Sequence, residues 1–151
     1  MMEWKPHITV AAVICREKKY LFVEEKINNN IVINQPAGHL EEGESLSHAI
    51  IREVHEETGG HFSPSGLVGI YHYWNNAEKI TYIRFCFHGE CLNFDTNAKL
   101  DKEIIKVIWL TKEELKNPAY YKRSPIVTQC LDDYEAGNLL PLELIKSNFA
   151  Y

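Results

Sequence analysis

Apolar and polar stretches alternate along the chain in a pattern that predicts many strands and one strong helix. An unbroken run of β-branched and apolar residues at 7–15 is typical of a buried strand. A second such run at 20–25 follows a polar turn at 17–19, so the two runs are expected to pair as a hairpin. A short strand at 31–33 follows the asparagine turn at 28–30.

The second half of the chain continues this pattern with longer strands and two further helices. The predicted strands lie at 67–74, 80–91 and 103–110, with loops at 63–66, 75–78 and 92–102. A capping-box pattern at 111–115 predicts a short helix. Another helix is expected from Ser124–Pro125 to about Glu135, with Gly137 as its stop. No internal repeat or linker divides the chain.

The strongest helical signal lies between Ser45 and Gly59. Ser45 can accept a backbone N–H of the first turn, and Gly59 can adopt the left-handed conformation that ends a helix. At about 100° per residue, Ile50, Ile51 and Val54 fall on one side and are expected to face the core. The opposite side carries acidic residues, which gives the helix a distinct chemical face.

Three carboxylates on this face, Glu53, Glu56 and Glu57, share an arc of roughly 100° that begins near Arg52. Like charges at i, i+4 destabilise a bare helix by a few tenths of a kcal/mol, and a hard cation between them relieves the repulsion. Such oxygen ligands favour Mg²⁺, Mn²⁺ or Ca²⁺ over zinc. An acidic run is ordinarily a solvated surface, but the neighbouring glycine turn and Glu44 favour a metal site.

The stretch 38–60 resembles the Nudix box, G-x5-E-x7-R-E-U-x-E-E-x-G-U, in which U is a bulky apolar residue. The matching residues are Gly38, Glu44, Arg52, Glu53, Val54, Glu56, Glu57 and Gly59. The final apolar position is instead Gly60, a departure that concerns the strand that follows the helix and leaves the ligand positions intact. Other segments are similar to the NudJ-type phosphatases of bacteria: K-P-H-I-T-V-A-A-V-I, N-Q-P-A-G-H-L-E, R-S-P-I-V and P-L-E-L-I.

The resemblance implies an α+β protein with the Nudix fold. In that fold a mixed β-sheet core is sandwiched between α-helices, and the box forms a loop–helix–loop. Residues 1–151 are expected to form one Nudix hydrolase domain with its box at 38–60. A chain of 151 residues, 45% hydrophobic and 25% charged, is long enough and apolar enough for one such globular domain.

The resemblance also implies a metal site and a set of catalytic groups. Mg²⁺, with Mn²⁺ as a substitute, is expected on Glu53, Glu56, Glu57 and the carbonyl of Gly38. Glu44 and Arg52 are expected to hold these ligands in place, with Arg52 also counted in the catalytic set. An acid from outside the box is expected to reach the metals or the water, with Glu103 as the candidate and Asp101 behind it. The general base stays open among Glu53, Glu56 and Glu103.

The substrate-binding candidates are three aromatic residues and one arginine. Tyr71, Tyr73 and Trp74 cluster near one strand end, either as core and rim aromatics or as a platform that stacks a base or pyrimidine ring. Arg84 lies among apolar neighbours, so a buried position would require a partner for its charge. That partner is either a substrate phosphate or a carboxylate.

Charge and cysteine content limit the partners. Sixteen basic against 21 acidic side chains give a formal net charge of −5, which offers no footprint for long nucleic acid. The expected partner is a small-molecule diphosphate or nucleotide, bound by a monomer or homodimer. No signal peptide or membrane-length apolar run is seen, and four dispersed cysteines indicate reduced thiols. A cytoplasmic protein without membrane attachment is therefore expected.

The resemblance implies hydrolysis of phosphoanhydride bonds in nucleoside di- and triphosphates, hydroxymethylpyrimidine diphosphate, or both. The alternatives within the enzyme class are a MutT-like sanitiser of oxidised nucleotides and an ADP-ribose or dinucleoside polyphosphate hydrolase. A regulatory nucleotide-binding Nudix domain without catalysis is the alternative from another class. The presence of every glutamate of the box disfavours that last alternative.

Overall fold

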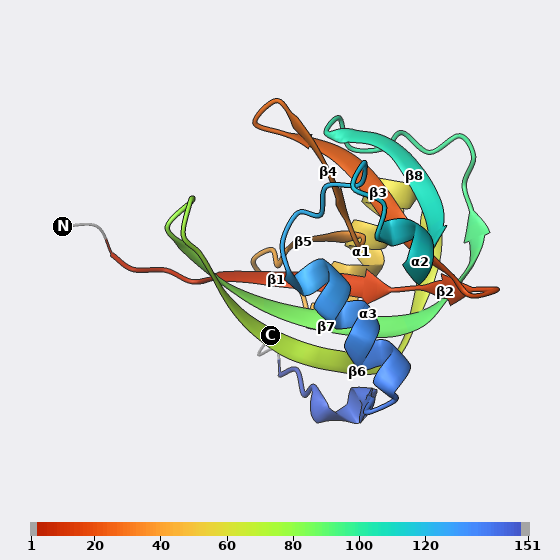
Figure 1. The fold of residues 1–151 in the computed structure, drawn as a ribbon. Helices are drawn as coiled ribbons and strands as arrows, with labels where there is room; N and C mark the ends of the chain where they lie inside the picture. The colour runs from red at the N-terminus through yellow and green to blue at the C-terminus, as the bar shows by residue number, and fades with distance from the viewer. Residues whose placement is uncertain (1–2, 149–151) are drawn as a thin grey trace.

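The computed structural model describes residues 3–148, which form two β-sheets and three α-helices (Figure 1). The elements are β1 (His7–Val13), β2 (Cys15–Arg16), β3 (Lys19–Ile27), β4 (Asn30–Asn34), β5 (Ala37–His39), α1 (Leu46–Thr58), β6 (Gly60–Asn75), β7 (Ile80–Phe94), β8 (Ile104–Thr111), α2 (Lys112–Leu115), α3 (Ile126–Ala136), β9 (Leu140–Pro141) and the 3₁₀ turn η1 (Leu142–Leu144). The five-stranded sheet has the order β5-β1-β7-β6-β9, and β3 organises the other sheet by pairing with β2, β4 and β8.

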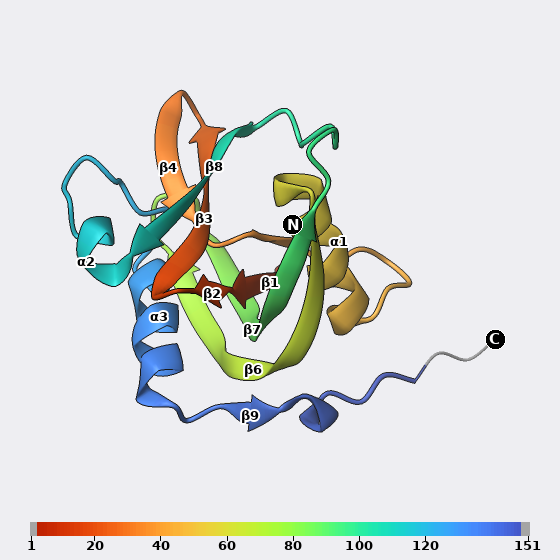
Figure 2. The same ribbon diagram turned by 90° about the vertical axis from the view of Figure 1, so that its right-hand side faces the viewer.

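The five-stranded sheet is mixed and lies between two helices. Its central pair, β1 and β7, is parallel, whereas its other pairs are antiparallel. Val10 packs in the same hydrophobic cluster as Val54 of α1, whereas the next residue, Ala11, packs in the cluster that holds Val127 of α3. Because successive side chains of a strand point to opposite faces, α1 and α3 cover opposite faces of this sheet (Figure 2). The predicted α+β Nudix arrangement is confirmed.

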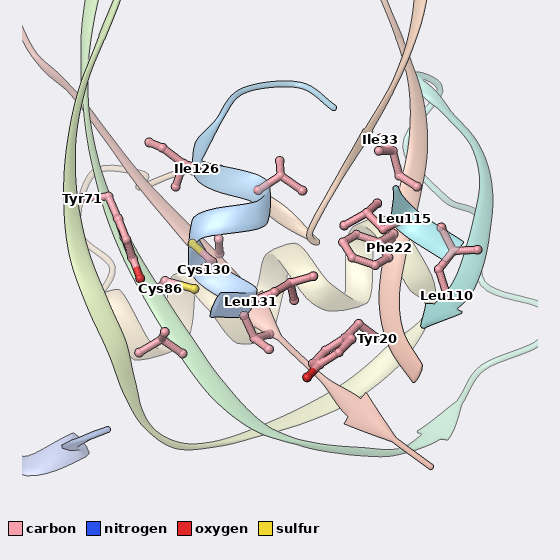
Figure 3. Close-up of a cluster of buried hydrophobic side chains, with 14 residues drawn as sticks. Tyr20, Phe22, Ile33, Tyr71, Cys86, Leu110, Leu115, Ile126, Cys130 and Leu131 are labelled. Atoms are coloured by element: carbon pink, nitrogen blue, oxygen red, sulfur yellow. The ribbon is translucent and has the colours of Figure 1, made fainter. Parts of the chain in front are cut away.

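The cluster under α3 joins the two sheets. Figure 3 shows Phe22 of β3, Leu110 of β8 and Leu115 of α2 around the same space as Leu131 of α3. All four side chains are almost fully buried. Truncating a residue of this kind to alanine costs about 2–5 kcal/mol, so this cluster holds the second sheet against the first. No helix within residues 3–148 is long and apolar enough to cross a membrane.

Two local predictions were wrong. The apolar run at 7–15 was expected to pair with the run at 20–25 as a hairpin. Instead, β1 pairs with β5 and β7 in the five-stranded sheet, whereas β3 lies in the other sheet. Only Cys15 and Arg16 turn back onto β3. The physical reason is that β1 is buried on both faces, which suits a central strand of a covered sheet.

The stretch 63–66 was predicted to be a loop because it contains proline and glycine, but it lies inside β6. Ser63 and Pro64 pair with β7, and the register shifts between Pro64 and Gly66. A bulge of this kind accommodates proline within a strand. The long hairpin β6–β7 is therefore continuous from the end of α1 to its far turn.

Candidate active site

The helix α1 begins and ends where the sequence predicts. The Ser45 hydroxyl accepts a hydrogen bond from the backbone N–H of His48 at 3.1 Å. Gly59 has a φ of 76°, and its N–H donates to the carbonyl of His55 at 2.9 Å. Ile50 and Val54 are fully buried under the sheet. The core position predicted for Ile51 was wrong, because this side chain is 37% exposed and lies about 100° around the helix from Ile50. This packing directs the opposite side of the helix, with its carboxylates, towards β5 and the loop that follows it.

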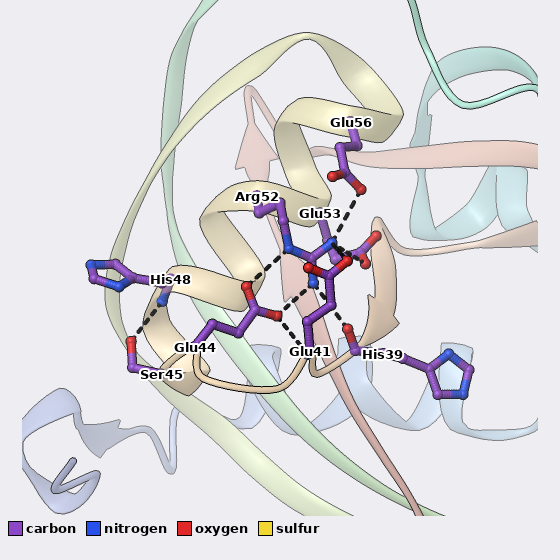
Figure 4. Close-up of polar contacts among 8 residues, drawn as sticks. All are labelled: His39, Glu41, Glu44, Ser45, His48, Arg52, Glu53 and Glu56. Atoms are coloured by element: carbon purple, nitrogen blue, oxygen red, sulfur yellow. Dashed lines mark hydrogen bonds and ion pairs between the residues drawn. The ribbon is translucent and has the colours of Figure 1, made fainter. Parts of the chain in front are cut away.

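Arg52 is the centre of the polar network on this side (Figure 4). Its Nε and Nη2 donate to the two oxygens of Glu44 at 2.9 and 2.6 Å. Its Nη1 donates to Glu53 at 2.8 Å and to Glu56 at 3.1 Å. Nη2 also donates to the carbonyl of His39 at 3.0 Å. One guanidinium therefore holds two carboxylates of the helix in place relative to the loop. Its forked N–H donors fix this geometry better than the single ammonium group of a lysine would.

A third carboxylate from a distant loop completes a cluster with two of the box glutamates. Oxygen atoms of Glu53, Glu56 and Asp101 lie within 4.8 Å of one another. The backbone N–H of Asp101 donates to the carbonyl of Glu56 at 3.0 Å, which holds the loop over the last turns of the helix. Glu103 is exposed and is not part of this cluster within residues 3–148. The geometry thus favours Asp101 over Glu103 as the acid from outside the box.

Burial sets the protonation of the two least exposed glutamates. It raises the pKa of Glu53 to about 7, although the neighbouring Arg52 acts in the opposite direction. Burial also raises the pKa of Glu57 to about 9, although the N–H of Ala37 donates to its Oε1 at 2.8 Å. A bound cation would favour the ionised form of both groups.

The donor set and the available space fit a hard divalent cation. All the clustered donors are carboxylate oxygens, which Mg²⁺ and Mn²⁺ prefer. Gly38 lies against them, because a Cβ at this position would come within 2.1 Å of the Glu53 carboxyl carbon. Only glycine allows the backbone of β5 to approach the glutamate so closely. Gly38 is therefore placed beside the carboxylates, as a ligand or a neighbour of the ion would be.

A cleft of about 190 Å³ adjoins this cluster on the α3 side of the sheet. Its lining residues are Thr9, Glu25, Asn34, Ala37, Gly38, His39, Tyr73, Asn75, Glu78, Tyr82, Arg84, Arg123, Ser124 and Ile126. Ala37 and Gly38 belong to both regions, since Ala37 holds Glu57 and Gly38 contacts Glu53. The cleft therefore borders the two backbone residues that contact Glu53 and Glu57.

The predicted substrate residues separate into two groups. Tyr73 and Arg84 line the cleft. Tyr71 is buried in the hydrophobic cluster under α3, where its hydroxyl donates to Asp133 at 2.6 Å. Trp74 is half exposed and does not line the cleft, because it follows Tyr73 on the strand and points to the other face.

The guanidinium group of Arg84 donates hydrogen bonds to neutral amide oxygens. The side chain is buried, with Nη1 donating to Gln35 and Nη2 donating to Asn34, both at 3.1 Å. Within residues 3–148 no carboxylate lies within ion-pair distance of Arg84. The arginine is thus held in a fixed position beside the cleft by hydrogen bonds to neutral groups.

Sequence reasoning missed several residues that line the cleft, among them Tyr82, Arg123, Glu25 and Glu78. Tyr82 lies directly opposite Tyr73 in the β6–β7 hairpin, so the register of that hairpin would have indicated it. Arg123 comes from the segment before α3 and contacts Glu25 of β3 at 3.4 Å. No local pattern signals that contact, because the two residues are 98 positions apart.

Comparison with known proteins identifies the family. The sequence model of the protein family described as the NUDIX domain matches residues 5–130. This chain belongs to the Nudix family. It is 39% identical over 142 residues to "Phosphatase NudJ" of Escherichia coli K12, an alignment that covers 94% of this chain and 92% of that protein.

Solved Nudix structures share its fold. A NUDIX hydrolase from Nitrosomonas europaea superposes with a TM-score of 0.92 at 46% identity, covering 95% of this chain and 98% of the other. A bifunctional NMN adenylyltransferase/ADP ribose pyrophosphatase from Francisella tularensis, complexed with AMP and a Mn ion, has a TM-score of 0.71. It is 20% identical and covers 87% of this chain and 42% of that one, so it shows the fold alone.

The predicted enzyme class is confirmed. The chain is a Nudix hydrolase similar to the NudJ phosphatases, an enzyme that acts on phosphoanhydride bonds. Nudix hydrolases act on small-molecule diphosphates with divalent metals, and the carboxylate cluster beside the cleft has the chemistry that this reaction needs.

Proposed function

We propose that this Nudix hydrolase uses Mg²⁺, with Mn²⁺ as a substitute, to hydrolyse nucleoside di- and triphosphates and hydroxymethylpyrimidine diphosphate. The observation that carries the proposal is the cluster of Glu53, Glu56 and Asp101, which lies against Gly38, a residue that also lines a small cleft. Similarity to "Phosphatase NudJ" over almost the whole chain supports a phosphatase activity, and the substrates proposed are those that the NudJ-type sequence resemblance implies.

The box residues would hold the metal ions. Glu53, Glu56 and Glu57, the carbonyl of Gly38 and the side chain of Asp101 supply oxygen ligands. When bound, the ions neutralise the charge of the transferring phosphoryl group and lower the pKa of water. The chain must then keep its carboxylates fixed and accept a proton.

Arg52 performs the first of these tasks by its hydrogen bonds to Glu53 and Glu56. We infer that one of these two carboxylates accepts the proton of the attacking water, because both belong to the cluster and Glu103 is exposed outside it. Arg84 places a positive charge beside the cleft, which favours an anionic substrate there.

The size of the cleft favours a small substrate. Its volume of about 190 Å³ is below the roughly 300–1,000 Å³ of most sites for drug-sized ligands. A single heterocycle can stack on Tyr73 or Tyr82, which face each other across the hairpin. A dinucleoside polyphosphate would leave its second nucleoside outside the cleft. This argument favours the pyrimidine diphosphate and single nucleotides over the dinucleotide alternative.

A panel assay tests the proposal. Nucleoside di- and triphosphates, hydroxymethylpyrimidine diphosphate, ADP-ribose and a dinucleoside polyphosphate are each incubated with enzyme and Mg²⁺. Orthophosphate and pyrophosphate are measured separately. We expect orthophosphate from the nucleotides and from the pyrimidine diphosphate. Turnover confined to ADP-ribose or to the dinucleotide would overturn the substrate proposal, and no turnover with Mg²⁺ bound would indicate a binding domain.

A further inference from the structure

A second cluster of metal-binding side chains lies on a different side of α1 from the glutamates. It consists of His55 of α1, His61 of β6 and Asp95 of the loop after β7. His55 is two residues from Glu53, and therefore about 160° away from it around the helix. The Nε2 atoms of both histidines lie 3.0 Å from the same oxygen, Oδ2 of Asp95.

The donors of this cluster suit a different metal from those of the box. Two imidazole nitrogens and one carboxylate oxygen are ligands for Zn²⁺ and other divalent transition metals. Around an ion with bonds of about 2.0–2.1 Å, neighbouring donors lie about 2.8–3.4 Å apart. The two separations of 3.0 Å, each of which is a hydrogen bond to Asp95 in this structure, also fall in this range, and all three donor atoms lie within 4.8 Å of one another.

The surroundings of the cluster also favour a cation. His55 lies in the last turn of α1, where the helix dipole favours positive charge. The backbone N–H of Asp95 donates to the carbonyl of Gly59 at 2.8 Å, which places the loop directly at this helix end. The three side chains are about half exposed, and His55 and Asp95 border an open hollow in the surface. An ion can therefore reach them from solvent.

We propose that His55, His61 and Asp95 form a binding site for a divalent transition metal, with Zn²⁺ as its preferred occupant. Each imidazole presents the lone pair of Nε2 to the ion and carries its proton on Nδ1, and Oδ2 of Asp95 supplies the third ligand. Water fills the remaining positions, since the site is open to solvent. The site is separate from the hydrolytic one, because none of its three residues belongs to the carboxylate cluster.

Such an ion would link three segments. It would join the end of α1, the start of β6 and the loop that continues from Asp95 to Asp101. The far end of the same loop supplies Asp101 to the carboxylate cluster. Zn²⁺ at the histidines would therefore restrain the loop that positions Asp101.

Titration with Zn²⁺ in the presence of excess Mg²⁺ tests this site. Binding is followed by calorimetry and by the ¹⁵N signals of the histidine side chains. In the wild-type protein we expect Zn²⁺ to shift the Nε2 signals of His55 and His61 together, with saturation at one added equivalent. His61→Ala and Asp95→Asn should each weaken this binding by about tenfold or more. His72→Ala is the matched control, since His72 is also exposed on β6 and lies outside the cluster.

Zn²⁺ that binds at the carboxylates does so equally in the wild type and in His61→Ala, so the difference between the two titrations reports only the histidine site. Equal Zn²⁺ affinity in the wild type, His61→Ala and Asp95→Asn would overturn the proposal. So would Nε2 signals that shift only at millimolar Zn²⁺. The readout is binding and not turnover, so this result and that of the substrate panel are independent of each other.

Discussion

The side chain of Arg52 connects more of the catalytic site than any single glutamate does. Because Arg52 and Glu56 lie on the same side of the helix, the sequence predicted that Arg52 supports the carboxylates. The structure adds two hydrogen bonds to Glu44 and one to the carbonyl of His39, which the position on the helix does not indicate. The guanidinium thus fixes the carboxylates relative to the loop before α1, which a flexible ammonium group cannot do with the same geometry.

Arg52→Lys should lower kcat by about 10–100-fold while the protein stays folded, because the charge is kept but the forked donor is lost. The Mg²⁺ affinity should also fall, since Glu53 and Glu56 are no longer held together. Steady-state kinetics and Mg²⁺ titration measure the two effects. If both the rate and the metal affinity match wild type, Arg52 does not position the ligands.

Glu57→Gln should remove most activity and weaken Mg²⁺ binding, because an amide cannot supply the ionised ligand. The fold should be preserved, since glutamine keeps an oxygen that accepts the N–H of Ala37. Activity assays and a thermal melt measure these outcomes. Glu42→Gln is the control, an exposed glutamate of the preceding loop. An unaltered rate in Glu57→Gln would refute the ligand assignment.

At the scale of elements, the β6–β7 hairpin determines which aromatic residues line the cleft. Strand alternation places Tyr73 in the cleft and the adjacent Trp74 on the other face, so the predicted platform is reduced to one of its three members. The hairpin also supplies Tyr82 opposite Tyr73. The sequence indicated the strands and their aromatics, but not the face that each aromatic covers.

Tyr73→Ala should raise the KM of the preferred substrate several-fold with a smaller effect on kcat, because the stacking surface is lost while the metal site is untouched. Base–aromatic stacking is worth about 1–3 kcal/mol, which corresponds to about 5–150-fold in affinity. Trp74→Ala is the matched control and should leave KM unchanged. Equal effects of the two substitutions would show that Tyr73 does not contact the substrate.

The start of β6 explains the departure of this chain from the box pattern. A Cβ at Gly60 would lie 2.4 Å from Sγ of Cys91 and 2.9 Å from Cε1 of Phe94. The strand nevertheless begins at Gly60, which pairs with Phe94. The buried Cys91 and the partly buried Phe94 therefore occupy the space that a larger side chain at this position would need.

Gly60→Val should destabilise the protein by about 1–3 kcal/mol, although it restores the residue type of the box pattern. Cys91→Ala in the same chain should recover part of that loss, because it removes the sulfur atom in the way. Chemical denaturation of the two single variants and the double variant measures the coupling. Additive effects of the two substitutions would contradict this explanation.

At the scale of the whole molecule, the fold buries two acidic groups of the candidate active site. Burial raises the pKa of Glu53 to about 7 and that of Glu57 to about 9, from a usual value of 4.5. Over this range the folded protein holds protons that the unfolded chain has already released. Unfolding then releases protons, so the stability of the metal-free protein should fall as the pH rises from about 4.5 towards 9.

Thermal melts in a chelator and in Mg²⁺ test this dependence. Without metal, the Tm should fall between about pH 5.5 and about pH 8.5, and the stabilisation by Mg²⁺ should grow over the same range. The double variant Glu53→Gln with Glu57→Gln should flatten both trends, because its amides do not titrate. A metal-free Tm that rises with pH in the wild type would show that these carboxylates are ionised in the folded protein.

The sequence by itself determined the helix α1, its two ends and the carboxylates that it presents. These features depend on contacts between residues three or four positions apart, and such contacts repeat wherever a helix forms. It also indicated the family, because the spacing of the box is a local property of the chain. The Arg52 role follows from the same periodicity.

Only the tertiary structure decided which other residues join the site. Asp101 rather than Glu103 reaches the glutamates because the loop is held by a backbone bond to α1. The cleft between Tyr73 and Arg123, and the meeting of His55 with Asp95, bring together residues that are 40 or more positions apart. Strand partners, bulges and loop paths depend on packing across the whole molecule, so no local period in the sequence encodes them.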